Sequence, residues 1–83
     1  MMTGRQFEQA ITELGMSQSG AARFLDVQRA TVIRYINDER RVPPSMAMLL
    51  TLMLRFHFKP NNIRKWAKLP PVEIGDGRFL TED

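Results

Sequence analysis

The sequence predicts a small all-α domain, a compact bundle of four or five helices. Its 83 residues suffice for one domain only. Apolar residues recur at helical spacing in successive segments, and glycine, proline or short polar stretches separate these segments. The composition, 43% hydrophobic and 25% charged, is typical of a globular protein.

The first helix is expected at residues 4–14. Thr3 can cap its start, and Gly15 suits its end because glycine readily adopts the left-handed conformation. The predicted inward side, spaced i, i+3, i+4 and i+7, is Phe7, Ala10, Ile11 and Leu14.

A second and a third helix are expected at residues 18–25 and 28–37, separated by a tight break at Asp26 and Val27. Ser17 is the predicted N-cap of the second helix. Its inward side, Ala21, Ala22 and Leu25, is small enough for another helix to approach closely. In the third helix the apolar cluster is Val32, Tyr35 and Ile36.

The fourth helix is expected to begin at the sequence "PPS", since proline fits the first helical turn, and to reach about Arg55 or His57. Its core side is predicted to be Met46, Leu49, Leu50 and Met53. We expect Pro60 to end this helix and Asn61 or Asn62 to cap a short fifth helix, "NIRKWAKL".

Residues 1–68 are expected to form the domain, and residues 69–83 an acidic C-terminal tail that is partly disordered or forms a small hairpin. Glycines flank Asp76 between the apolar pairs Val72/Ile74 and Phe79/Leu80, which is the pattern of a hairpin turn.

The charge is unevenly distributed. Residues 1–68 carry 11 of the 12 Lys/Arg and 5 of the 9 Asp/Glu, a net of +6, whereas residues 69–83 carry a net of −3. A basic domain favours an anionic partner, of which nucleic acid is the commonest. Charge alone is equally compatible with a basic protein that binds no polyanion.

Several classes of site are excluded or disfavoured. Without cysteine the chain can form neither disulfides nor thiolate metal sites, and we expect a cytoplasmic location. The one histidine, His57, has no second ligand at metal spacing. No nucleophile has an adjacent base and no glycine-rich phosphate loop occurs, so we expect no enzyme, metal or cofactor.

No membrane segment or secretory signal is expected. The longest apolar run, Met46–Leu54, is far shorter than the roughly 20 residues that a span needs. The first residues are amphipathic and include Glu8 and Glu13, which a signal peptide would not contain.

The third predicted helix has an unusual outward side. Two guanidinium groups, two amides and small apolar groups lie away from Val32 and Tyr35. In a DNA major groove, arginine can bond guanine, glutamine and asparagine can bond adenine, and a small apolar side chain can contact a thymine methyl. The alternative is an ordinary solvated polar face.

Residues 18–37, "QSGAARFLDVQRATVIRYIN", resemble the helix-turn-helix of the phage-repressor and Cro-like (Xre) family. Gln18 stands at the first position of the motif and Ala22 at its small fifth position. The four apolar packing positions are Leu25, Val27, Val32 and Tyr35. The resemblance extends over about residues 4–56 and implies a lambda-repressor-like fold and a double-stranded DNA partner.

The resemblance also implies site residues. The bases would be contacted by Gln28, Arg29, Ala30, Arg34 and Asn37. The phosphates would be contacted by Ser17, Gln18, Thr31, Arg40, Arg41 and Ser45. The protein would then be a small sequence-specific transcriptional regulator with residues 28–37 in the major groove.

The chain departs from the family pattern at two turns. Asp26 stands where the family commonly has glycine, and aspartate is one of the few residues that tolerates positive φ. Asp38 and Glu39 follow Asn37, where glycine is frequent. Two carboxylates beside the expected phosphate path would oppose DNA binding.

The fourth helix is apolar nearly all round, so its outer side near Met48 and Leu52 requires a cover. One cover would be the fifth helix, folding back through Trp66. The other would be a second copy of the chain, since such regulators often read paired half-sites. The alternative function is an antitoxin-type interaction module, in which residues 44–57 and the acidic tail bind another protein.

Overall fold

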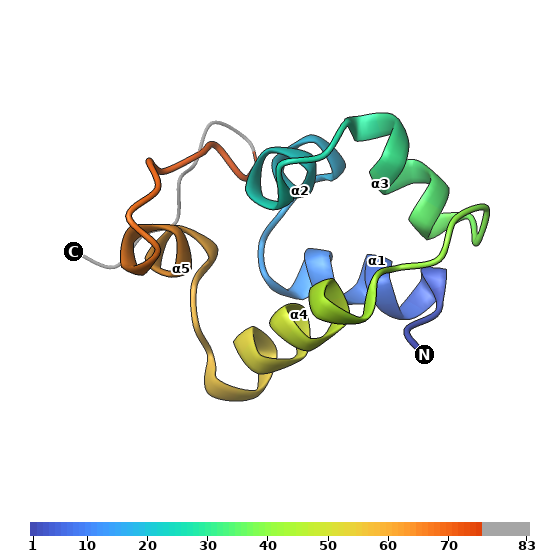
Figure 1. Cartoon of the computed structure of the whole chain (residues 1–83), viewed down its shortest axis with the longest axis horizontal. Coiled ribbons are helices and arrows are strands. Elements are labelled where there is room, and N and C mark those ends of the chain that lie inside the picture. Colours follow the sequence, from blue (N-terminus) through green and yellow to red (C-terminus); the bar gives the residue numbers. More distant parts are fainter. Residues whose placement is uncertain (76–83) are drawn as a thin grey trace.

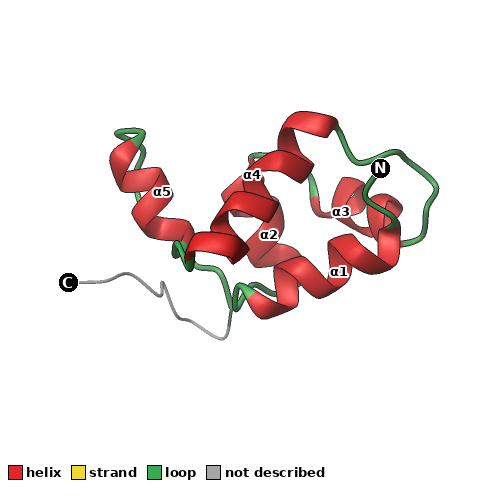
Figure 2. Cartoon of the chain, turned by 90° about the horizontal axis from the view of Figure 1, so that it is seen from below, coloured by secondary structure: helices red, strands yellow, loops and turns green. Residues whose placement is uncertain are grey.

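In the computed structural model, which describes residues 1–75, five helices make up a bundle (Figure 1). The bounds are α1 (Gly4–Glu13), α2 (Gln18–Leu25), α3 (Arg29–Ile36), α4 (Pro44–Phe56) and α5 (Pro60–Trp66). Helices α3 and α5 lie at opposite ends of the molecule in both views, with α1, α2 and α4 between them (Figure 2). The all-α prediction is confirmed.

The predicted start of α1 is confirmed by a reciprocal pair of hydrogen bonds. The Thr3 hydroxyl accepts from the Gln6 N–H at 3.1 Å, and the Gln6 side-chain oxygen accepts from the Thr3 N–H at 2.9 Å. This capping box satisfies two N–H groups that the helix itself leaves unbonded.

The core is one cluster of buried side chains from α1, α2, α3 and α4 and from the segment after α5, and Ile63 of α5 packs against it. Phe7 and Ile11 of α1, Val32 of α3, and Leu50 and Met53 of α4 are fully or almost fully buried. Met46 and Leu49 pack against this cluster as partly buried side chains, so the predicted core side of α4 is confirmed.

The prediction for the junction of α4 and α5 was wrong in detail. Helix α4 ends at Phe56, and His57 turns the chain with a left-handed φ of 58°. Pro60 does not terminate α4 but begins α5, where a missing N–H costs nothing. Neither Asn61 nor Asn62 is the N-cap; that position belongs to Lys59, without a side-chain cap hydrogen bond.

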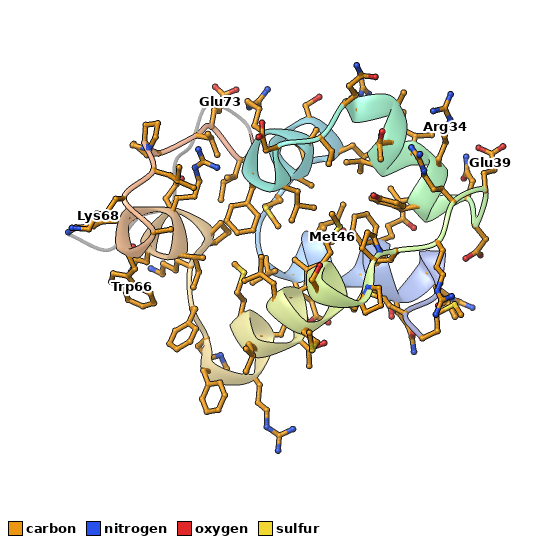
Figure 3. The ribbon with its side chains drawn as sticks, in the orientation of Figure 1. Arg34, Glu39, Met46, Trp66, Lys68 and Glu73 are labelled. Carbon is orange, nitrogen blue, oxygen red and sulfur yellow. The ribbon has the colours of Figure 1, made fainter. Side chains whose placement is uncertain are left out.

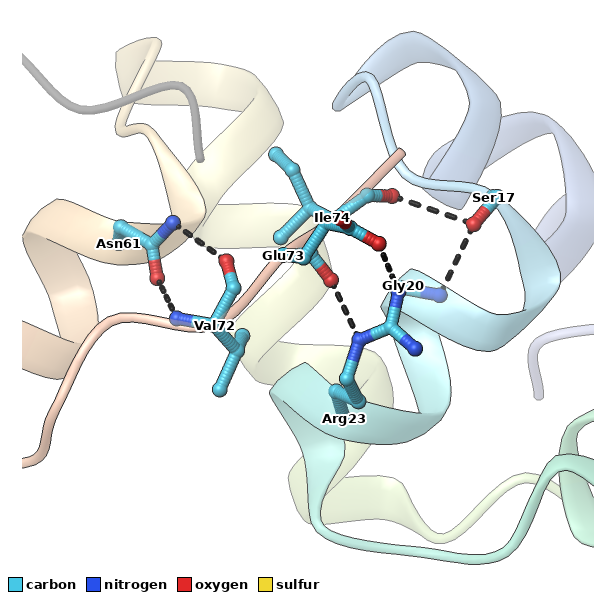
Figure 4. Close-up of polar contacts among 7 residues, drawn as sticks. All are labelled: Ser17, Gly20, Arg23, Asn61, Val72, Glu73 and Ile74. Carbon is cyan, nitrogen blue, oxygen red and sulfur yellow. Dashed lines mark hydrogen bonds and ion pairs between the residues drawn. The ribbon is translucent and has the colours of Figure 1, made fainter. Parts of the chain in front are cut away.

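Asn61 instead fixes the segment that follows α5. Its side chain is buried, donates to the Val72 carbonyl at 2.9 Å and accepts from the Val72 N–H at 2.8 Å (Figure 4). This two-way pairing satisfies both the buried amide and the backbone of the segment.

The next residues of that segment lie against α2 (Figure 4). The Ile74 carbonyl accepts from the Ser17 N–H at 2.7 Å and from the Ser17 hydroxyl at 3.3 Å. Arg23 donates to the Glu73 carbonyl at 2.7 Å and pairs with its carboxylate at 3.3 Å. A Cβ on Gly20 would overlap the Ile74 carbonyl, so only glycine permits this approach.

Residues 72–75 are therefore part of the packed body, and the expectation that a separate tail begins at residue 69 was wrong. The Ile74 side chain is 0% exposed and belongs to the core. The sequence analysis assigned Ile74 to the tail because the alanines and glycine of α2 do not indicate which segment covers them. The remainder of the expected tail or hairpin, residues 76–83, lies outside the described residues.

Helix α5 does not fold back over α4, which corrects the first of the two covers considered. Met48 is 63% exposed and Leu52 is 51% exposed, while Trp66 packs edge-on against Phe58 with ring centroids 5.3 Å apart. Arg64 ties α5 to the α2 side by donating to the Phe24 carbonyl at 3.2 Å and the Pro70 carbonyl at 2.7 Å. Within residues 1–75, exposed apolar side chains thus remain both on α4, at Met48 and Leu52, and around the corner between α4 and α5, at Phe56 and Trp66.

Candidate nucleic-acid interface

The turn between α2 and α3 depends on Asp26. This residue ends α2 in the left-handed conformation with φ 58° and ψ 47°, as predicted, and its N–H donates to the Ala22 carbonyl. Aspartate adopts this conformation at less cost than most residues. Gln28 then serves as the N-cap of α3, and Asn37 as its C-cap, so both predicted ends lie one residue outside the helix.

One side of α3 is anchored to the rest of the protein. Val32 is fully buried, and the Tyr35 ring meets Phe7 of α1 edge-on at 5.3 Å. A Cβ on Gly4 would overlap the Ile36 carbonyl, so α1 and α3 approach at backbone distance there. The orientation of α3 is consequently set by α1 as well as α2.

The opposite side of α3 is exposed over its full length. The exposed residues are Gln28, Arg29, Ala30, Arg34 and Asn37. Arg34 points away from the body (Figure 3), and within residues 1–75 no ion pair holds its guanidinium or that of Arg29. These are the five residues expected to contact bases, and each of them is exposed.

The residues expected to contact phosphates are less uniform. Arg40, Arg41 and Ser45 are exposed, the last in the first turn of α4, whereas Gln18 and Thr31 are half-buried. Ser17 is exposed, but its N–H and hydroxyl both donate to the Ile74 carbonyl, and its hydroxyl also caps Gly20. The chain itself therefore uses the polar groups of Ser17.

Asp38 has a structural partner that sequence reasoning missed. Its carboxylate oxygen accepts from the Gly4 N–H, the first N–H of α1, at 2.7 Å, and its φ is 59°. A carboxylate at a helix N-terminus interacts favourably with unbonded N–H groups and the helix dipole. Asp38 thus links the exit of α3 to the start of α1, and its charge is partly compensated by α1.

Replacing Asp38 by alanine should destabilise the protein by about 1–3 kcal/mol, because a helix cap is lost and alanine is strained at positive φ. Asp38→Asn is the matched control, since asparagine tolerates this φ and keeps an accepting oxygen; its cost should be under about 1 kcal/mol. Urea denaturation followed by circular dichroism measures both. Equal stability of the two variants would show that the contact with Gly4 contributes nothing.

Two further groups of residues escaped the sequence reasoning. Arg23 was given no role from the sequence, yet it donates to the Glu73 carbonyl and pairs with the Glu73 carboxylate. The ring contacts that join Phe56 and Phe58 to Trp66 were also missed, because α5 was expected to cover α4.

A helix-turn-helix family model matches residues 7–58. This range is more than half of the chain and includes α2, the Asp26 turn and α3. The chain belongs to this helix-turn-helix family, of the Xre, lambda-repressor-like kind. No curated protein and no solved structure matches the chain.

The helix-turn-helix is a DNA-binding domain rather than an enzyme fold. Within residues 1–75 no group of His, Asp or Glu side chains is arranged to hold a metal ion. In the same part of the chain, no helix combines the length and apolar character needed to cross a membrane.

Proposed function

We propose that the protein binds double-stranded DNA in a sequence-specific manner and acts as a small transcriptional regulator. The observation that carries the proposal is the division of α3 into two sides. Val32 and Tyr35 hold one side in the core, and the other presents amides, small apolar side chains and two guanidinium groups that form no ion pair within residues 1–75. A helix supported in this way fits the major groove.

In the proposed complex, specificity comes from the exposed side of α3. Arg29 and Arg34 are suited to guanine, and Gln28 and Asn37 to adenine, while Ala30 is small enough to lie against a thymine methyl. Position on the duplex comes from phosphate contacts, for which we propose Gln18, Thr31, Arg40, Arg41 and Ser45. Ser17 is left out, because the Ile74 carbonyl engages it.

Selection from a randomised duplex pool tests the proposal. A recovered consensus would establish specificity, and its symmetry would show whether two half-sites are read. Binding to random-sequence duplex should weaken steeply with salt, since each neutralised phosphate contributes a slope of about −0.9 in log K against log salt. A pool without enrichment, together with salt-independent binding, would contradict the proposal.

We further propose that the protein is a homodimer through α4. Met48 and Leu52 border an apolar groove of about 850 Å³ between α1 and α4, whose floor includes Ala10, Val42 and Ala47. A second copy would cover both exposed side chains and the groove, and a two-fold dimer is the commonest assembly of such regulators.

Leu52→Asp should raise the dimer dissociation constant by at least about a hundredfold, because a two-fold interface would bury the new charge twice. Analytical ultracentrifugation at high micromolar concentration measures the change. Trp66→Ala, on the other exposed surface, is the control and should leave the mass unchanged. A wild-type protein that sediments as a monomer at this concentration would contradict the dimer.

The α1–α4 groove also supports a second candidate function, an antitoxin-type module whose α4 binds a different protein. A monomeric wild-type protein that still binds DNA through α3 would favour this candidate. Of the acidic residues that the same candidate assigned to the tail, Glu73 pairs with Arg23, and Asp76, Glu82 and Asp83 lie outside the described residues.

A further inference from the structure

Three aromatic side chains form a row at the corner where α4 meets α5. The rings of Phe56 and Phe58 stack with centroids 5.9 Å apart, and Phe58 meets Trp66 edge-on at 5.3 Å. Phe56 is 57% exposed and Trp66 is 59% exposed, and Leu69 is exposed beyond the end of α5. This aromatic row (Phe56, Phe58 and Trp66) is an apolar surface that nothing in residues 1–75 covers.

Exposed cations flank both ends of the aromatic row. Arg55 precedes Phe56 in the last turn of α4, and Lys65 and Lys68 lie on either side of Trp66 in the sequence. Within the described residues none of these three cations takes part in an ion pair. The sequence also contains no Asp or Glu between Glu39 and Glu73, so no carboxylate is close to these three cations along the chain.

We propose that the aromatic row is a docking surface for an acidic peptide segment of another protein, one that carries aromatic or large aliphatic side chains between its carboxylates. Such a segment matches both properties of the surface, because its apolar side chains cover the rings and its carboxylates meet Arg55, Lys65 and Lys68. Trp66 and Lys68 lie at the opposite end of the molecule from Arg34 (Figure 3), so DNA on α3 leaves this surface open.

Charge distinguishes this occupant from the others. A second copy docked on the same surface would bring the same cations into contact, which is unfavourable. Single-stranded nucleic acid would engage the cations and the outer face of Trp66, yet it would leave Phe56 and Leu69 in water. An acidic apolar segment leaves neither charge nor apolar surface unmatched.

The test uses the full chain and a short fluorescently labelled peptide in which Asp and Glu alternate with Leu and Phe. Fluorescence anisotropy measures its binding, and Trp66, the only tryptophan, reports from the surface itself. We expect saturable binding that weakens with salt and shifts the Trp66 emission. Two control peptides, one with serine for the apolar residues and one with lysine for the acidic residues, should bind at least about tenfold more weakly.

Four variants localise the binding. Phe56→Ser should weaken the peptide complex by about tenfold, whereas Phe56→Leu, which keeps an apolar side chain, should retain most of the affinity. Lys65→Glu combined with Lys68→Glu should weaken it similarly and flatten its salt dependence. Arg34→Ala, on α3, should bind the peptide as the wild type does, and Phe56→Ser should keep duplex binding, which shows that it is folded.

Five outcomes would overturn the proposal. The labelled peptide could fail to bind, or its affinity could be unchanged by Phe56→Ser. A labelled oligothymidylate could bind in its place and shift the Trp66 emission. Self-association that Phe56→Ser abolishes would assign the surface to a second copy. Finally, tighter peptide binding after Glu82→Lys and Asp83→Lys would assign it to the end of this chain.

Discussion

Ile74→Ala is expected to lower the free energy of unfolding by about 2–5 kcal/mol, the cost of removing a large aliphatic side chain from a packed core. The Ile74 side chain is 0% exposed and is packed with the core side chains of α1, α3 and α4. For a domain of this size such a loss is a large part of the total stability. Urea denaturation followed by circular dichroism measures it.

Leu69→Ala is the matched control, because it removes the same kind of side chain from an exposed position in the same segment. Its effect should stay within about 0.5 kcal/mol. If the two variants were equally stable, residues 72–75 would not be docked on α2 in solution, and the assignment of this segment to the core would be wrong.

Arg34→Ala is expected to cost about 1–3 kcal/mol of binding free energy on the selected site and to relax preference at one base position. The reason is that Arg34 is exposed on the side of α3 opposite Val32, with no ion pair to another described residue. Affinity measurements on the selected duplex and on its single-base variants test both parts.

Arg41→Ala provides the contrast. This residue lies in the loop before α4, so its loss should weaken binding to all sequences alike and reduce the salt slope by about 1. If Arg34→Ala changed binding to no sequence, the docking of α3 would be wrong. A uniform loss of affinity would instead place Arg34 on the phosphates.

The helix-turn-helix was predictable because its determinants are local. The spacing of Val27, Val32 and Tyr35 predicts which side of α3 is buried, and the structure confirms it for Val32 and Tyr35. The tolerance of aspartate for positive φ predicts the turn at Asp26. These signals act over a few residues and need no knowledge of the rest of the fold.

The features that were not predicted depend on partners distant in the sequence. Asn61 is of a residue type that commonly caps helices, yet its side-chain amide pairs with the backbone of Val72. Asp38 reads as a carboxylate that opposes DNA, yet it caps a helix that starts 34 residues earlier. In both cases one polar side chain has several chemically equivalent uses, and only the tertiary contacts select among them.

The same distinction applies to the candidate site. The exposure of Ala30, Arg34 and Asn37 follows from helical periodicity, because these residues lie opposite Val32 and Tyr35. The hydrogen bond from Ser17 to the Ile74 carbonyl does not follow from periodicity, because it joins residues 57 positions apart. The position of Trp66 away from Met48 and Leu52 also does not follow from helical periodicity, because it depends on how Arg64 attaches α5 to α2.

The docking of Ile74 on α2 also has a consequence for how the protein folds. Helices α1 to α4 can associate soon after they are synthesised, but the surface around Gly20 and Ala21 stays uncovered until residue 74 has been added. Contacts between such distant segments form late because a long loop must close first. During synthesis helices α1 to α4 are therefore expected to exist for a time with part of their core open, where chaperones or proteases have access.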